Sequence, residues 1–159
     1  MTTTTLTHRP IGKILVDGIL AGLAGGIAFD AYLWLTTVLP VRGSLPAMWE
    51  WVASAVFGNA ALSNPRFATA GLAVHLAVSI GWAIAYAWVA SSRPSINQRW
   101  QISGVTYGLV VYLLMQTILL VDDKWVFPPS PNAFLNAVAA HALFFGPPVA
   151  YVVARLQRA

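Results

Sequence analysis

The stretch Ile14–Leu39 reads ILVDGILAGLAGGIAFDAYLWLTTVL and decides the class of this protein. It is nearly uncharged, and it is longer than the ~20 apolar residues that a helix needs to cross a ~30 Å hydrocarbon core. Three further runs of the same kind follow, at about Phe67–Ala90, Ile102–Val121 and Ala133–Ala154. The sequence therefore predicts an all-α polytopic membrane protein with four transmembrane helices.

The overall composition agrees with a membrane location. Hydrophobic residues make up 58% of the 159 residues, charged residues only 9%, and the mean hydropathy is +0.68. These values are too apolar for an ordinary soluble domain, and the four spans leave no room for a separate catalytic domain. The chain has no cysteine, so disulfides and thiolate metal sites are excluded. The basic residues are scattered near the predicted helix ends, which gives no support for nucleic-acid binding.

Basic residues predict the orientation, because cytoplasmic loops of membrane proteins carry an excess of Lys and Arg. One side of the membrane would hold Arg9, Lys13, Arg93, Arg99, Arg155 and Arg158. The other side would hold Arg42, Arg66 and Lys124 together with Glu50, Asp122 and Asp123. We therefore expect both termini in the cytoplasm of a bacterial cell, with the chain in its inner membrane. The first span exceeds the 7–15 apolar residues of a signal peptide, so we expect it to remain uncleaved.

The connection between the first two spans, PVRGSLPAMWEWVASAVFGNAALSNPR, is apolar and Trp-rich in its centre but too short to cross a bilayer. Pro46 follows Ser44 at a position typical of a first helical turn. We expect a short helix in the membrane interface, with Trp49 and Trp51 at the depth of the lipid headgroups. An alternative interpretation is a lid over an outward-facing cavity.

The first and third spans resemble each other, and so do the second and fourth. Setting DGILAGLAGGIAFDAYLWL on SGVTYGLVVYLLMQTILL, and GLAVHLAVSIGWAIAYAW on NAVAAHALFFGPPVAYVVARL, aligns Gly18 with Gly104, Gly22 with Gly108, Asp30 with Gln116 and His75 with His141. The pattern predicts two similar hairpins, at about 11–92 and 98–156, within a single membrane domain over 1–159, related by a pseudo-twofold axis. Glycines spaced by four residues are typical of close helix packing.

Polar residues inside the spans are the candidate functional residues. Asp30, His75, His141 and Gln116 all fall in the outer half of the bilayer, so they could meet around the pseudo-axis. A central Asp costs about 2.5–3.5 kcal/mol to insert, which means that such residues usually have a partner or a function. The sequence leaves three uses open: a structural Asp–His pair, a tetrapyrrole site, and a metal site or proton relay.

The tetrapyrrole hypothesis takes His75 and His141 as axial ligands of haem b or bacteriochlorophyll. Gly71 and Ala137, each four residues earlier, would leave room for a flat macrocycle. The segment AVAAH also resembles the Ala-x-x-x-His pattern of antenna helices. Beyond His141, Pro147 and Pro148 remove donors to two carbonyls, which predicts a kink that either opens space or only adjusts the packing.

Several motifs together resemble a known family. They are GILAGLAGGIAFD, MWEWVASAVFGNAA leading to LAVHLAVSIGWAIAYA, and GVTYGLVVYLLM with AAHALFFG. In this order the chain resembles small bacterial inner-membrane proteins of the YagU-like kind. The resemblance implies the fold and carries over no catalytic residue.

No nucleophile constellation, phosphate loop or complete metal motif appears in the sequence. We therefore expect a small non-enzymatic membrane subunit, in contact with membrane lipids and packed against other membrane subunits or further copies of itself. The alternatives are a tetrapyrrole-binding redox or light-harvesting subunit, and a small transporter or proton-conducting protein.

Overall fold

The computed structural model describes residues 9–40, 43–121 and 130–158. Within these ranges the chain is helical and contains no strand. Four stretches are long and apolar enough to cross a membrane, namely Ile11–Val38, Phe67–Ser91, Trp100–Leu120 and Pro131–Arg158. The ends of these stretches lie within four residues of the ends of the predicted spans. The all-α class is thus confirmed for the described residues, and so is the presence of four helices that are long and apolar enough to span a membrane.

Two spans are regular α-helices, α3 (Phe67–Ser91) and α5 (Trp100–Val121). The other two contain a widened π-helical turn; they are α1 (Ile11–Leu33) with η1 (Trp34–Val38), and α6 (Pro131–Ala139) with η3 (Ala140–Phe145) and α7 (Gly146–Arg158). Short helices connect the spans: α2 (Leu45–Phe57), the 3-10 helix η2 (Asn59–Ser63) and α4 (Pro94–Gln98).

The predicted short helix between the first two spans is α2. Its first turn is capped by Ser44, whose hydroxyl accepts a hydrogen bond from the Ala47 amide at 3.3 Å, and it contains Pro46. Both are typical of a helix N-terminus. The helix ends at Gly58, whose φ of 75° favours glycine.

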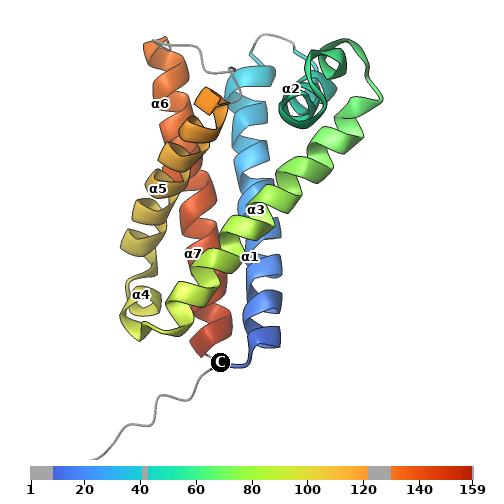
Figure 1. The fold of residues 1–159 in the computed structure, drawn as a ribbon. Helices are drawn as coiled ribbons and strands as arrows, with labels where there is room; N and C mark the ends of the chain where they lie inside the picture. Colours follow the sequence, from blue (N-terminus) through green and yellow to red (C-terminus); the bar gives the residue numbers. More distant parts are fainter. Residues whose placement is uncertain (1–8, 41–42, 122–129, 159) are drawn as a thin grey trace, which may run out of the picture.

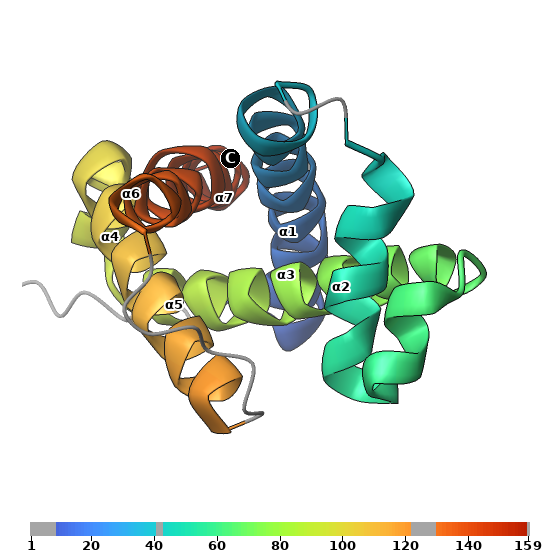
Figure 2. The ribbon, with the colours of Figure 1, turned by 90° about the horizontal axis from the view of Figure 1, so that it is seen from above.

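The central helix of the arrangement is α1, which packs against α3, α7 and η3. Figure 2 shows α1 between the fourth span and α2, with α3 crossing α1 and α2 lying against the first half of α3. Figure 1 shows the start of α1, α4 and the end of α7 at one end of the molecule, and α2 and α6 at the other. The most buried core residues are small or β-branched, among them Ala21, Ala83, Ala87, Val149 and Val153.

Glycines on α1 bring its backbone against α3. A Cβ atom added at Gly18 would lie 2.6 Å from the Ile84 Cα, and one added at Gly22 would lie 2.5 Å from the Ile80 Cα. No side chain larger than hydrogen fits such an approach without displacing backbone. The glycines at these two positions are therefore required by the helix crossing.

Glycines on α5 act in the same way toward the fourth span. An added Cβ at Gly104 would lie 2.7 Å from the Pro147 Cα, and one at Gly108 would lie 2.9 Å from the Ala142 Cα. Gly146 of the fourth span packs closely against α5 in turn, because a Cβ added there would meet the Gly108 nitrogen at 2.8 Å. Glycine therefore lines both sides of this second crossing.

Near Pro147 and Pro148, where the sequence predicts a kink, the helix contains a π-turn. In η3 the Gly146 amide donates to the His141 carbonyl, five residues back. This turn contains His141 and ends at Phe145, two residues before Pro147, so the backbone widens where the prolines remove donors. A second π-turn, η1, ends with the Leu39 amide donating to the Trp34 carbonyl at 2.8 Å.

Candidate functional site

Asp30 and His75 lie within ion-pair distance of each other, between the first two spans. Asp30 lies one turn before η1, and His75 lies in the first half of α3. The His75 Nε2 atom is 3.2 Å from the Asp30 Oδ1 atom, and the two side chains are 15% and 16% exposed. The Nε2 atom is buried, and its contact with the carboxylate does not have the geometry of a hydrogen bond. The proximity of the two groups offsets only part of the cost of placing a carboxylate in an apolar helix pair.

The helix α2 covers this pair. The Trp49 side chain interacts with the Asp30 carboxylate, and its indole Nε1 is buried without a hydrogen bond of normal geometry. The backbone of α2 approaches this closely because Gly71 has no side chain; a Cβ there would meet the Trp49 backbone and the Ala53 nitrogen. Of the two tryptophans expected at headgroup depth, Trp51 is 48% exposed, whereas the Trp49 indole nitrogen is turned into the protein.

His141 lies near the pair but outside it. Its Nδ1 atom is 2.8 Å from the Ala137 carbonyl, which can only accept, so Nδ1 is the protonated nitrogen. The Phe29 ring contacts both imidazoles, with centroid distances of 5.5 Å to His75 and 4.8 Å to His141. Tyr112 contacts His141 as well, at 5.5 Å. The two histidines are thus connected through an aromatic ring.

Gln116, the fourth predicted member of the polar set, is half-buried in α5. Among the described residues it forms no hydrogen bond or ion pair with Asp30 or either histidine. The described part of the chain also contains no group of three His, Cys, Asp or Glu side chains that could hold a metal ion. The structure therefore brings Asp30 and His75 together and places His141 beside them. Among the described residues, Gln116 has no hydrogen bond or ion pair to any of the three.

A macrocycle held between the two histidines does not fit this arrangement. Axial imidazoles must approach the metal of a tetrapyrrole from its two faces, and here the Phe29 ring contacts both imidazoles. The space expected beside Gly71 is occupied by the backbone of α2 at Trp49. Tetrapyrrole binding at His75 and His141 together would require Phe29 to move.

A second set of polar contacts, which the sequence analysis did not single out, lies at the opposite end of α1. Asp17 is 4% exposed, and its Oδ2 atom is 3.0 Å from the Arg9 Nε atom. Arg9 also donates to the Leu156 carbonyl at 2.8 Å. Arg9 precedes Pro10 and α1 itself, so helical spacing gave no signal for this pair.

The connection between the second and third spans contributes Asn97. Its Nδ2 atom donates to the Gln157 Oε1 atom at 2.8 Å, and the Gln157 Nε2 atom donates to the Ala87 carbonyl at 2.9 Å. Asn97 is 7% exposed and joins α4 to α7.

Four of the charged residues used to predict the orientation, Arg42, Asp122, Asp123 and Lys124, lie outside the described residues. Comparison of the chain with protein-family models, curated proteins and solved structures finds no match. The YagU-like resemblance therefore stays a prediction.

Proposed function

We propose that this protein is a small non-enzymatic membrane subunit that works packed against a transmembrane helix of another subunit. The proposal rests on one face of α3. Four small residues spaced by four positions, Ala73, Ala77, Gly81 and Ala85, are all exposed on this helix. Such a face lets a neighbouring backbone approach closely, which favours association of helices in lipid.

A groove supports the same surface as the contact site. It has a volume of about 310 Å³ and lies between the start of α1 and the second half of α3, lined by Ile11, Ile14, Leu15, Gly81, Ile84, Ala85 and Trp88. A Cβ added at Gly81 would meet nothing within 4 Å. The open space beside a glycine, among aliphatic side chains and one indole, suits an apolar helix as the occupant.

The membrane placement is part of this proposal. Arg9, Lys13 and Arg158 lie together around one end of the molecule, which favours that end as the cytoplasmic side of a bacterial inner membrane. The two glycine crossings support the interpretation of two similar hairpins in one domain. In the same interpretation α2 lies at the opposite interface, with Trp51 directed toward lipid.

The transport alternative has less support. Within the described ranges the two ion pairs of the chain are Arg9–Asp17 and Asp30–His75. The two aspartates are thirteen residues apart on α1, or about 20 Å along the helix axis. No carboxylate or imidazole on α1 lies between them, so α1 supplies no ionisable intermediate for a proton relay.

Cross-linking tests the proposed contact directly. The chain has no cysteine, so Gly81→Cys introduces a single thiol in the groove. In a separate control variant, Leu113→Cys places a single thiol on the exposed side of α5. We expect a thiol cross-linker, applied to membranes of cells that naturally make the protein, to join Gly81→Cys to a second chain. The mass of the product then tells whether that chain is another copy or a different subunit.

A pair of glycine substitutions separates association from folding. Gly81→Leu fills the groove, whereas Gly12→Leu adds the same side chain at a glycine that also has nothing within 4 Å and does not line the groove. We expect Gly81→Leu alone to convert the complex isolated in mild detergent into free monomer. The proposal would be contradicted if the wild-type protein is monomeric in mild detergent and the Gly81→Cys variant forms no cross-link to a second chain.

A further inference from the structure

The helix α2 is attached to the four spans through a small contact. Its buried residues are Ala53 and Ser54, and its backbone lies over Gly71 of α3, where an added Cβ would be 2.6 Å from the Trp49 carbonyl carbon. Among the described residues, the hydrophobic core between the spans includes no residue of α2. Figure 1 shows α2 at one end of the molecule, beside the first half of α3. This helix can therefore leave α3 without opening the core.

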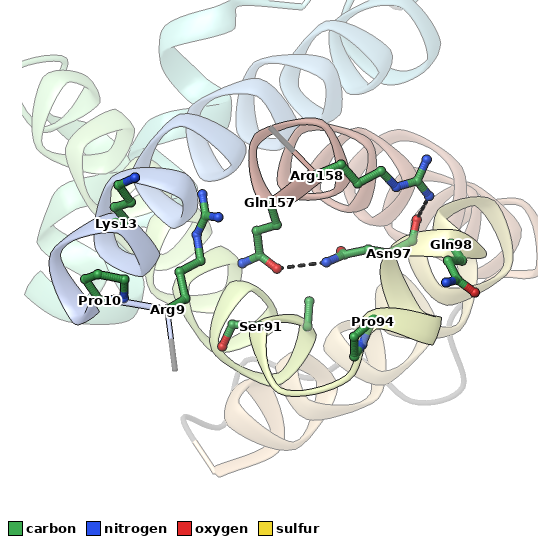
Figure 3. A pocket seen from close by; sticks show the side chains of 10 residues that line it. Arg9, Pro10, Lys13, Ser91, Pro94, Asn97, Gln98, Gln157 and Arg158 are labelled. Atoms are coloured by element: carbon green, nitrogen blue, oxygen red, sulfur yellow. Dashed lines mark hydrogen bonds between the residues drawn. The ribbon is translucent and has the colours of Figure 1, made fainter. Parts of the chain in front are cut away.

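The polar atoms beneath α2 are only partly satisfied. The Trp49 Nε1 and His75 Nε2 atoms are buried, and neither has a hydrogen bond of normal geometry. Both side chains lie beside the Asp30 carboxylate. At the other end of α1, by contrast, Asn97 and Gln157 share a hydrogen bond of 2.8 Å, as Figure 3 shows. Because buried polar atoms without partners are costly, the docked position of α2 is stabilised less than its close packing on Gly71 suggests.

The net charge beneath α2 depends on how many protons Asp30 and His75 hold. With one proton between them, the two side chains have no net charge, whichever of them holds it. A second proton leaves a cationic imidazole that has lost its anionic partner. Because an unpaired charge is costly in an apolar site, the second proton favours the state in which α2 has left and water reaches the imidazole.

Two further titratable side chains lie on the elements packed around this pair. His141 of η3 contacts the Phe29 ring, which also contacts His75, so a proton on His141 adds positive charge to the same region. Glu50 is the one charged side chain of α2 and is half-buried; in acid it loses its negative charge and cannot balance the imidazole. Tyr112 of α5, which contacts His141, stays neutral. Acid therefore changes the charge in one direction only.

We propose that α2 is an acid-sensitive cover over Asp30 and His75. The cover is docked on Gly71 while the pair holds one proton. A second proton releases it and exposes the pair to the solution at that end of the molecule. The Trp49 indole contributes to this response, because its contact with the Asp30 carboxylate is stronger when the carboxylate is ionised.

Thiol accessibility in the full chain in detergent measures the docking of α2. The chain has no cysteine, so Ser54→Cys places a single, nearly isosteric thiol at a residue that is 1% exposed. Ala47→Cys, at an exposed position of the same helix, is the matched control. The ratio of the two rates of reaction with a water-soluble maleimide corrects for the effect of pH on the reagent. We expect this ratio to rise roughly tenfold between about pH 8 and about pH 5, the range in which imidazoles titrate, as the open state changes from a minor to a major population.

Neutral substitutions, each combined with the two cysteine variants, give opposite predictions. His75→Gln leaves Asp30 as the titratable member of the pair, so acid should neutralise the site and lower the ratio. Asp30→Asn leaves the imidazole, so acid should still raise the ratio. The double variant Asp30→Asn/His75→Gln has an uncharged pair at either pH and should keep the ratio small throughout, which also shows that it folds. Glu50→Gln should keep the response of the wild type.

Gly71→Leu defines the open limit, because its side chain meets the backbone of α2 and should make both thiols react alike at either pH. A wild-type ratio that is the same at both pH values, whether small or equal to that of Gly71→Leu, would overturn the proposal. A rise in acid as large as that of the wild type, in either His75→Gln or the double variant, would also overturn it, since another group would then be the sensor.

Discussion

Two helix crossings in this protein depend on paired glycines, but with different spacing on the opposing helix. They are the crossing of α1 with α3 and the crossing of α5 with the fourth span. Each has two glycines four residues apart on its first helix. On α3 the opposing residues, Ile84 and Ile80, are also four apart, whereas on the fourth span Pro147 and Ala142 are five apart. The extra residue is accommodated by the π-turn η3, which contains Ala142 and ends two residues before Pro147.

This difference changes the position of the histidines. His75 lies five residues before Ile80, the residue that meets Gly22, whereas the backbone of His141 itself is nearest Gly108. The alignment of His75 with His141 in the sequence is therefore displaced by about one turn in the structure. Equal spacing of glycines shows that two helix pairs pack alike, but it does not make their polar residues equivalent.

The largest expected effect comes from adding one methyl group at a crossing. Gly108→Ala and Gly22→Ala should each lower the free energy of unfolding by about 2–3 kcal/mol, because the new Cβ meets backbone. Gly81→Ala, where the space is open, should leave stability unchanged or raise it by up to about 1 kcal/mol. Thermal unfolding in one detergent measures all three. Equal stability of the three variants would mean that the crossings are looser than described.

A smaller effect is expected from the polar residues that distinguish the crossings. Asp30→Asn should lower the free energy of unfolding by roughly 1–2 kcal/mol, because it weakens the contact with His75. Gln116→Leu, at the position aligned with Asp30, should have no comparable effect. A double-mutant cycle of Asp30→Asn with His75→Gln isolates the pair energy, and a coupling near zero would show that the ion pair does not fasten the helices.

The smallest effect concerns a contact between the two helix pairs. The Tyr86 hydroxyl on α3 is 2.9 Å from the Ser103 hydroxyl on α5. Removing this hydrogen bond with Ser103→Ala should cost about 0.6 kcal/mol, the mean for such contacts between membrane helices. Tyr86→Phe is the matching change, and the two losses should not add. Additive losses in the unfolding measurement would indicate that the hydroxyls act independently.

Much of the fold could be predicted from the sequence, because length and apolarity alone determine a membrane span. The four spans and the start of α2 at Ser44 were predicted from such local signals. The positions of Asp30 and the two histidines along their helices were also predictable, since they follow from residue number. Which histidine pairs with Asp30 was not predictable, because it depends on the rotation of each helix about its axis.

The parts that the sequence did not predict depend on irregular backbone. The π-turn η1 has no proline, and only the hydroxyls of Thr36 and Thr37, which donate to carbonyls four residues earlier, accompany it. Arg9, which pairs with Asp17 of α1, and Asn97 both lie outside the long helices. Helical spacing carries no information about such contacts.

The π-turn η3 also bears on how this chain tolerates changes in length. A π-turn holds one residue more than the regular helix that could replace it. Deleting one residue within Ala140–Phe145 therefore lets the fourth span become regular while Val149 and Val153 stay directed toward the core. The same deletion early in α3 rotates everything after it by about 100° and turns Ala83 and Ala87 outward. A single-residue deletion should therefore leave the protein folded when it lies within Ala140–Phe145 of the fourth span. The same deletion should destabilise the protein when it lies early in α3.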